Sequence, residues 1–456
     1  MPRCTRSASA VRSIAHVLAV WLMLETISLA AFAQSFAVTP NLPTQKPAPH
    51  NQTVPERGSS SLEALINEAG KNNPQILAAK DAWRAATQVP SQVSTLPDPQ
   101  FTVQQFAVGS PRPFAGFTNS NFAYIGFGVS QDLPYPGKLR LRGEAAKLEA
   151  DTEANRVESV RRTVIEQLKA AYFQLAYELE ELSLLDRDGK LLDQVAQIAE
   201  ADYRVGKGNE QDVLKAQLEK TKLLATIEMH HQEHFRLEAK LKQLLNRPLS
   251  AADIIPDHLT ETAIHASVDD LLAKIRAQNP DIRGRQQMIQ NKSVQVEIAH
   301  KNIYPDFNVQ YMWQHTAAQY RDYYMLTVGA RIPIHQSRKQ WPEVEQAVQE
   351  LHQSQRDYEA QVQQAYFDLR DQYLKAETAE RVLNIYQQGL VPQAANTFKA
   401  GLAAYQSNRE DFETLLNSFL DVLRLGEEYW RNLLDHELAV AQIEQITGIH
   451  LNKAEE

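Results

Sequence analysis

The run His230-His231-Gln232-Glu233-His234 holds the side chains best able to do chemistry in this sequence. Its His-x-x-Glu-His pattern places two histidines at positions i and i+4, the spacing with which one class of metalloprotease holds zinc. A zinc-dependent periplasmic peptidase built on His230, Glu233 and His234 is therefore one hypothesis for the chain. Its activity would be abolished in the variant Glu233→Gln.

The element that must carry these histidines indicates a different role. Apolar residues and the two histidines follow one another in alternating steps of four and three, as in helices that pack side by side. The series is Leu223, Ile227, His230, His234, Leu237, Leu241 and Leu244. Both histidines would then face a partner helix instead of an open cleft. We favour this interpretation over contact with a transported or adventitious metal ion, and over catalysis.

Signatures of other enzyme classes do not occur in the sequence. It contains no Gly-x-Ser-x-Gly, no glycine loop for phosphate, no Cys-x-x-Cys and no dinucleotide fingerprint. We therefore expect a protein that is not an enzyme and needs no cofactor. No resident metal is expected either, and His230 and His234 are only weak candidates for a metal contact.

The N-terminus has the layout of a signal peptide. Three early arginines precede an apolar run and the small-residue cleavage site Ala31-Phe32-Ala33, so residues 1–33 are predicted to be removed on export. Residues 34–60 hold five prolines and no apolar period, which predicts an extended tether. Cys4 is the only cysteine and lies in the signal, so the mature chain would have no disulfide and no lipid-bearing cysteine.

Composition excludes several classes of protein. The chain has 43% hydrophobic and 23% charged residues, and loss of the signal would shift its net charge from −9 to −11, which does not favour nucleic acid. Beyond the signal there is no apolar run of about 18 residues, as a membrane-spanning helix requires. Any membrane crossing would then need a closed β-barrel.

The remaining sequence contains an internal duplication. Asn73-Pro74 recurs as Asn279-Pro280, and Phe101-x-Val103-Gln104 recurs as Phe307-x-Val309-Gln310, in both cases 206 residues later. Identical offsets at two points argue for one unit used twice. The expected boundaries are 62–248 for the first repeat, 249–266 for a linker, 267–448 for the second repeat and 449–456 for a C-terminal tail.

Each repeat contains a helix far longer than is usual in globular proteins. Residues 138–203 hold no proline and would run about 100 Å as one helix, which requires a packing partner along its length. The segment 338–404 repeats the pattern, with a kink expected at Pro392. The predicted seam of the first long helix is Val160, Val164, Leu168, Tyr172, Leu175, Leu179, Leu182 and Leu185.

Two pairs of short strands with alternating apolar and polar residues precede these helices. They are expected at about 99–108, 121–133, 306–315 and 322–333. Such segments suit a transmembrane barrel with its apolar side outward, although a half-buried soluble sheet alternates in the same way. Four strands cannot close a barrel, whereas three chains supply twelve. The predicted lipid-facing residues are Ile125, Phe127, Val129, Tyr311, Trp313, Leu326 and Val328.

Together these features resemble the outer membrane factor family, the TolC-type ducts of tripartite export systems. The resemblance covers about 62–448, and it also rests on Leu96-Pro97-Asp98-Pro99 and Leu133-Pro134-Tyr135-Pro136-Gly137-Lys138, which flank the first strand pair, and on a paired turn motif. It implies a mainly α fold with a small β part. In that fold a duplicated helix–strand–strand–helix–helix unit forms a trimeric 12-stranded β-barrel continued by a long α-helical barrel.

The resemblance also implies a function. The chain would be a homotrimeric duct in the outer membrane of a Gram-negative bacterium, in contact with lipid and with its helical part in the periplasm. It would passively conduct metal ions or small toxic compounds from a periplasmic adaptor (membrane fusion) protein and an inner-membrane pump of the RND type. Gly389 with Pro392, and Asp411-Phe412, are most similar to the heavy-metal-efflux branch, which points to heavy metal resistance. A periplasmic coiled-coil adaptor or scaffold remains the alternative.

The paired turn motif implies a gate at the periplasmic tip of the helices. The turns are Tyr203-x-x-Gly206, followed by Asp212, and Tyr405-x-x-Asn408, followed by Asp411. A glycine or asparagine suits a helix end with positive φ. In the family a tyrosine–aspartate hydrogen bond links neighbouring coils here, which assigns that bond to Tyr405 and Asp212.

This sequence departs from the family at the tip. Thr414 and Asn417 stand where some members have constricting aspartates, and Glu410 replaces an arginine. An acidic ring could instead be formed by Glu410, Asp411 and Glu413, or these carboxylates could simply solvate a helix start.

Prolines mark the junction between strands and helices. Pro134, Pro136, Gly137 and Pro333 are expected to turn the chain from tilted strands into axial helices, because proline and glycine end one ladder without starting another. An ordinary strand-to-helix loop is the alternative.

Overall fold

The computed structural model describes residues 61–106, 123–316 and 321–451. Residues 58–456 form one compact unit, separate from residues 1–57. The predicted signal peptide and tether lie outside the described residues, as do the last five residues of the predicted tail and the predicted strand ends 107–108 and 121–122.

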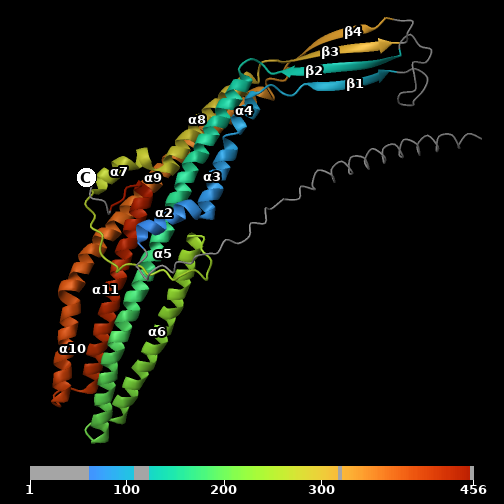
Figure 1. The fold of residues 1–456 in the computed structure, drawn as a ribbon. Helices are drawn as coiled ribbons and strands as arrows, with labels where there is room; N and C mark the ends of the chain where they lie inside the picture. The colour runs from blue at the N-terminus through green and yellow to red at the C-terminus, as the bar shows by residue number, and fades with distance from the viewer. Residues whose placement is uncertain (1–60, 107–122, 317–320, 452–456) are drawn as a thin grey trace, which may run out of the picture. The chain divides into compact units, whose positions relative to one another are not determined.

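The first repeat begins with three short helices, continues with two strands and ends with a helical hairpin (Figure 1). Its elements are α2 (Leu62–Asn72), α3 (Pro74–Ala86), α4 (Val89–Ser94), β1 (Gln100–Phe106), β2 (Tyr124–Leu133), α5 (Lys138–Arg204) and α6 (Glu210–Leu244).

The second repeat has the same order of parts, with one interruption. Its elements are α7 (Val268–Gln278), α8 (Pro280–Lys301), β3 (Asp306–Thr316), β4 (Tyr323–Arg331), α9 (Gln340–Ile385), the π-helical turn η1 (Tyr386–Leu390), α10 (Val391–Gln406) and α11 (Phe412–Thr447). The fold is therefore mainly helical with a small β part, and the duplication predicted from the two matched sequence pairs is present in the structure.

Matched asparagines hold equivalent joints in the two repeats. Asn73 caps α3 and donates from Nδ2 to the carbonyl of Leu244, at 2.8 Å. Asn279 caps α8 and donates from Nδ2 to the carbonyl of Ile446, at 3.0 Å. Each asparagine thus satisfies exposed amides at a helix start and ties that helix to the end of the last helix of its own repeat.

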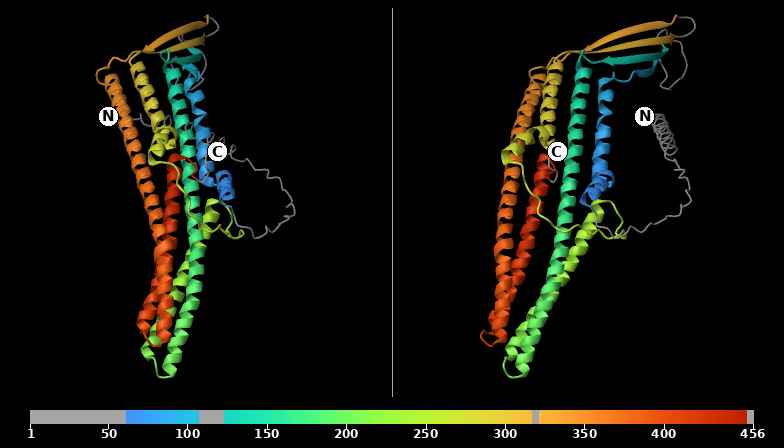
Figure 2. Two further views of the ribbon diagram at one scale, coloured as in Figure 1. Left: turned by 90° about the vertical axis from the view of Figure 1, so that its left-hand side faces the viewer. Right: turned by 60° about the vertical axis from the view of Figure 1, so that its left-hand side comes forward.

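The four strands form one antiparallel sheet in the order β1-β2-β3-β4. The sheet lies at one end of the unit, and the turns of the two long hairpins lie at the other end (Figure 2). Register brings the apolar side chains of all four strands into rows. One row pairs Phe101 with Val129, Val129 with Tyr311, and Tyr311 with Leu326.

Helix α5 runs unbroken for 67 residues because neighbours cover it along its length. It packs against α3, α4 and α8 near the sheet and against α6 and α11 toward the other end. Val164, Leu168 and Leu175 are fully buried, as the predicted seam requires.

The predicted seam is wrong over the next two turns. Leu179 and Leu182 are only half-buried, and Glu178 and Glu181 take the buried positions. The departure is local, because Leu185 on the predicted seam is again fully buried.

The second long helix is interrupted where the sequence predicts a kink, but the disturbance precedes the proline. Pro392 lies at the start of α10, and η1 occupies the five residues Tyr386–Leu390 before it. Proline removes one backbone donor and its ring crowds the carbonyl four residues earlier, so the chain widens by a π-turn there.

None of the helices within the described ranges combines the length and the apolar run that crossing a membrane requires.

Candidate functional site

Two helical turns form the end of the unit opposite the sheet. One joins α5 to α6 and the other joins α10 to α11 (Figures 1 and 2). A shared apolar cluster connects both hairpins just behind the turns, with Leu192 from α5, Phe398 from α10 and Phe419 from α11 among its buried members. The two turns therefore belong to one packed structure.

The first turn reverses the chain through Gly206, whose φ is +71°. The backbone amides of Lys207 and Gly208 donate to the carbonyl of Asp202, at 2.8 and 3.1 Å, which closes the end of α5. The carboxylate of Asp212 accepts from the amide of Asn209 at the start of α6, at 3.4 Å. Asp212 thus helps to cap its own helix. Tyr203 is exposed.

The second turn uses Asn408, whose φ is +58°. The amide of Arg409 donates to the carbonyl of Ala404, at 2.9 Å. Asp411 caps α11 by accepting from the amide of Thr414, at 2.8 Å, and this bond holds the pKa of Asp411 below its usual range. Both turns have the positive φ that the sequence motif predicts.

Tyr405 lies between the two turns. Partial burial first, and then the carboxylate of Asp202, which accepts a hydrogen bond from the phenol, raise the pKa of Tyr405 to about 12. Asp212 is close enough to add a smaller electrostatic effect on the same pKa. Phe412 packs against the ring edge-on, with centroids 5.8 Å apart. Within one chain the hydrogen-bond partner is therefore Asp202, and a bond from Tyr405 to Asp212 between neighbouring coils stays a prediction.

An ion pair joins the two hairpins at the tip. Lys215 of α6 donates to Glu413 of α11, at 2.8 Å, which raises the pKa of Lys215. Sequence reasoning missed Lys215 because its partner is 198 residues away. Glu413 forms this ion pair with Lys215, Asp411 caps α11, and the carboxylate of Glu410 lies beside Gly401. Each of the three candidate ring carboxylates thus has a local contact.

The strand-to-helix junction is held by a network centred on Asp306. Its Oδ1 accepts from the backbone amide of Tyr135 and from Nζ of Lys138, both at 2.8 Å. Tyr135 stacks on Tyr304 with centroids 4.6 Å apart, and the ammonium group of Lys301 lies over both rings.

Prolines and glycine shape the path of the chain at the same junction. Gly137 has φ +90° directly before α5, and Pro134 and Pro136 precede it. Pro333 lies between β4 and α9. The sequence therefore indicated the turn residues but not the ionic network that fixes them.

The sheet exposes most of its predicted lipid-facing residues. Phe127, Val129, Tyr311, Leu326 and Val328 are exposed in the single chain, and Leu326 is the most open, at 68%. Ile125 and Trp313 are half-buried, the latter stacked on Phe127 at 5.8 Å. One face of the sheet is thus apolar across all four strands.

One residue of the histidine run, His230, contacts α5. Nδ1 of His230 lies 2.7 Å from a carboxylate oxygen of Glu178. Glu233 forms an ion pair with Arg236 on its own helix. His234 stacks on Phe235, and its Nε2 is buried without a hydrogen-bond partner. In the part of the chain that the structure describes, no group of three or more His, Cys, Asp or Glu side chains is arranged to hold a metal ion.

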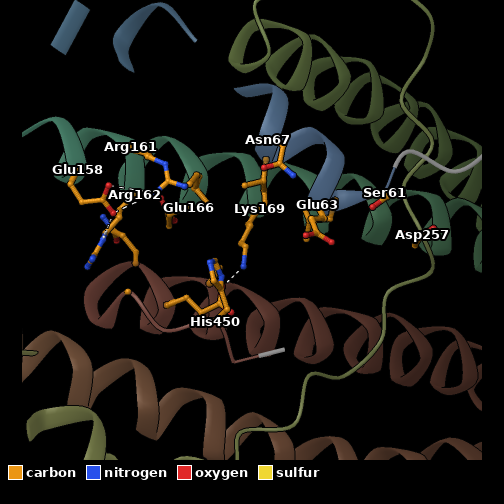
Figure 3. A pocket seen from close by; sticks show the side chains of 17 residues that line it. Ser61, Glu63, Asn67, Glu158, Arg161, Arg162, Glu166, Lys169, Asp257 and His450 are labelled. Atoms are coloured by element: carbon orange, nitrogen blue, oxygen red, sulfur yellow. Dashed lines mark hydrogen bonds and ion pairs between the residues drawn. The ribbon is translucent and has the colours of Figure 1, made fainter. Parts of the chain in front are cut away.

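A cavity of about 490 Å³ lies between α2, α5 and the end of α11. Figure 3 shows Arg162 and Lys169 projecting from α5 toward the segment that carries His450. Lys169 forms a buried ion pair with Glu444, whose other oxygen accepts from the amide of Leu451 at 2.8 Å. Arg161 and Arg162 both pair with Glu158. Lys169 thus links the C-terminal segment to α5, whereas Arg161 and Arg162 form ion pairs within α5.

Comparison with known proteins agrees with this architecture. The sequence profile of the family described as "Outer membrane efflux protein" matches residues 65–247 and 271–407, which is more than half of the chain. The chain belongs to this family. Its members are passive channels of the outer membrane with the helical part in the periplasm, not enzymes. No curated protein sequence matches the chain.

Solved structures with the same fold have low sequence identity. The outer-membrane channel OprN is 15% identical and has a TM-score of 0.76, with 86% of this chain and 91% of OprN covered. The outer membrane protein VceC from Vibrio cholerae is 16% identical, with a TM-score of 0.71 and coverage of 85% and 96%. CusC is 15% identical, with a TM-score of 0.72 and coverage of 85% and 92%. These likenesses show the fold.

Proposed function

We propose that this efflux protein is the outer-membrane duct of a tripartite efflux system. Three copies join their four-stranded sheets edge to edge into a twelve-stranded barrel, and their hairpins continue the lumen into the periplasm. An adaptor protein and an inner-membrane pump of the RND type deliver substrate to the tip. The carrying observation is the apolar face that runs in register across all four strands, on a chain whose opposite end consists of paired helical turns.

Membrane extraction tests the placement of the sheet. A barrel whose lipid-facing side chains include Leu326 and Val328 should stay in the outer-membrane fraction after a carbonate wash and leave it only with detergent. Release by the wash alone would favour a periplasmic coiled-coil scaffold and would overturn the duct. A detergent-free monomer in plain buffer would do the same.

The tip is proposed as the gate. A lumen closed by side-chain contacts opens when those contacts break, so the double variant Asp212→Ala with Tyr405→Phe should raise single-channel conductance in planar bilayers. Asp202→Ala removes the acceptor that Tyr405 uses within its own chain and should act in the same direction. Unchanged conductance in both variants would show that Tyr405 does not contribute to the gate. Glu149→Gln, an exposed change on α5 far from the tip, serves as the control.

A metal-ion substrate is the finer proposal, and it rests on Gly389 with Pro392 and on Asp411-Phe412, which are similar to the heavy-metal-efflux branch. An acidic tip would favour cations. In a salt gradient the reversal potential should then indicate cation selectivity, and the triple change Glu410→Gln, Asp411→Asn, Glu413→Gln should reduce it. Selectivity that is absent, or that survives the triple change, would count against cation selection by the tip.

A further inference from the structure

A layer of ionisable side chains crosses the helices between the tip and the sheet, nearer to the tip. We define the mid-coil layer as Glu178 and Glu181 of α5, His230 of α6, and Glu427 and Arg431 of α11. Glu181 is only 1% exposed, and its Oε2 has no hydrogen-bond partner. A buried carboxyl group without a partner is costly when charged, so this position requires an explanation beyond packing.

Glu181 occupies a core position of α5. The buried series along this helix runs Glu181, Leu185, Asp188 and Leu192, in steps of four, three and four. Asp188 is fully buried as well, with Oδ1 paired to Arg187 at 3.1 Å and Oδ2 without a partner. Two carboxyl groups thus interrupt an otherwise apolar seam.

Two glycines allow the neighbouring helices to approach α5 closely in this region. A Cβ atom at Gly426 of α11 would lie 3.1 Å from the side chain of Leu184 on α5. A Cβ atom at Gly189 of α5 would lie 3.2 Å from Leu223 of α6. Helix α5 is therefore approached closely from both sides near Glu181, and tight packing leaves its carboxyl group desolvated.

The charged groups around Glu181 come from all three helices. Glu178, Asp188 and Tyr177 face it from α5, and Glu427 and Arg431 face it from α11. From α6, Nδ1 of His230 lies 2.7 Å from a carboxylate oxygen of Glu178.

These neighbours do not neutralise Glu181. Arg431 is held by the phenol of Tyr177, with which it shares a hydrogen bond. Burial first, and then the charge of Glu427, raises the pKa of Glu181 to about 8. Burial also raises the pKa of Glu178, Asp188 and Glu427.

The layer is connected to the break in the second hairpin. Glu428, the residue after Glu427, accepts a hydrogen bond from the phenol of Tyr386, at 2.7 Å. Tyr386 is the first residue of the π-helical turn η1. A π-turn is a weak point at which a helix bends. Because Tyr386 is bonded to Glu428, a movement of α11 in this layer would also move the π-turn η1.

We propose that the mid-coil layer is a proton-dependent clamp between the two hairpins. With a proton on Glu181, α11 stays packed on α5; loss of that proton places adjacent negative charges between the helices, which separates α11 from α5 and bends the second hairpin at η1. This inference rests on the proposed function, because the movement would open the duct.

The direction of the pH effect follows from linkage. The folded state holds the proton of Glu181 up to about pH 8, whereas an unfolded or opened chain releases it near its ordinary pKa of 4.5. The packed state therefore binds more protons over that interval, and its stability falls as pH rises from about 4.5 to about 8.

Hydrogen–deuterium exchange of the full mature protein tests the clamp at the helices themselves. After correction for intrinsic exchange rates, peptides covering 175–192 and 420–435 should exchange at least about tenfold faster at pH 9 than at pH 6. Glu181→Gln, which mimics the protonated side chain, should abolish most of that difference. Glu149→Gln, an exposed change on the same helix, should leave it intact. Equal pH dependence in the wild type and Glu181→Gln would overturn the proposal.

A second variant keeps the test decisive if Glu181→Gln does not fold. Glu427→Gln removes a negative charge beside Glu181, which should lower the pKa of Glu181. The exchange transition should then have its midpoint at a lower pH, and the loss of protection between pH 6 and pH 9 should be smaller than in the wild type. A pH profile identical to the wild type would contradict the clamp. Hydrogen–deuterium exchange measures opening of the helices whether or not the protein conducts ions. A protein without channel activity would therefore contradict the proposed duct function but would leave this test of the clamp valid.

Discussion

The two hairpins come from one repeated unit but differ in continuity. In the first, α5 is a single helix of 67 residues, whereas in the second the corresponding helix is divided by η1 into α9 and α10. The ends of both hairpins are nevertheless equivalent. Residues 206 and 408 at the tips have positive φ and are 202 residues apart, as are residues 246 and 448 at the far ends. Backbone geometry was therefore kept at the ends, and the middle of one copy diverged.

The four end positions show which residue types satisfy this geometry. Each pair consists of one glycine and one asparagine: Gly206 with Asn408, and Asn246 with Gly448. Glycine adopts positive φ freely, and asparagine is the next most tolerant residue. The two copies thus use opposite choices at the two ends for the same conformation.

The largest expected effect comes from placing the second hairpin's proline in the first. By the same 202-residue offset, Pro392 corresponds to the exposed Lys190 of α5. Lys190→Pro should lower the free energy of unfolding by about 3 kcal/mol or more, because α5 has no π-turn to absorb the lost hydrogen bond. Chemical denaturation measures the loss. Lys190→Ala is the control, and a proline variant as stable as that control would show that α5 tolerates a break.

A smaller loss is expected at the far end of the second hairpin. Gly448 has φ +74°, and a Cβ atom there would collide with the guanidinium group of Arg162. Gly448→Ala should cost about 1–3 kcal/mol, because strain from positive φ is added to this collision. Thermal melting provides the measurement. Adding Arg162→Ala should restore part of the loss, and no restoration would mean that backbone strain alone is responsible.

Exchanging residue types at the tips should produce effects of opposite sign. Asn408→Gly relieves a side chain at positive φ, while Gly206→Asn introduces one, each changing stability by no more than about 1 kcal/mol. The double exchange should be close to neutral in denaturant midpoint. A large loss in either single variant would indicate a contact of the side chain beyond the turn geometry.

The smallest effect concerns Tyr405, which contacts Asp202 across the two tips. Its pKa is raised from 10 to about 12, so the folded state retains the phenolic proton and loses stability as pH rises through that interval. Tyr405→Phe should weaken the alkaline loss of stability relative to the wild type. Melting temperatures of both proteins at pH 9 and pH 11 would show this. If the drop in melting temperature between the two pH values is the same in Tyr405→Phe as in the wild type, Tyr405 does not contribute to the alkaline loss of stability.

The repeated architecture could be predicted from residue patterns alone. The duplicated Asn-Pro pairs and the alternating strands predict elements because their periodicities follow from backbone geometry. Residues suited to positive φ likewise revealed both tip turns before any contact was known. Local rules also located the break near Pro392, although they did not predict the π-turn that precedes it.

Which side chains meet depends on how distant segments of the chain pack together. The pairing of Tyr405 with Asp202, of Lys215 with Glu413 and of Asp306 with Lys138 joins residues more than 160 positions apart, so no local pattern reveals it. The burial of Glu181 in place of Leu182 has the same origin. The positions of α6 and α11 decide which side chains of α5 are covered, and they place a carboxyl group where the sequence pattern predicts a leucine.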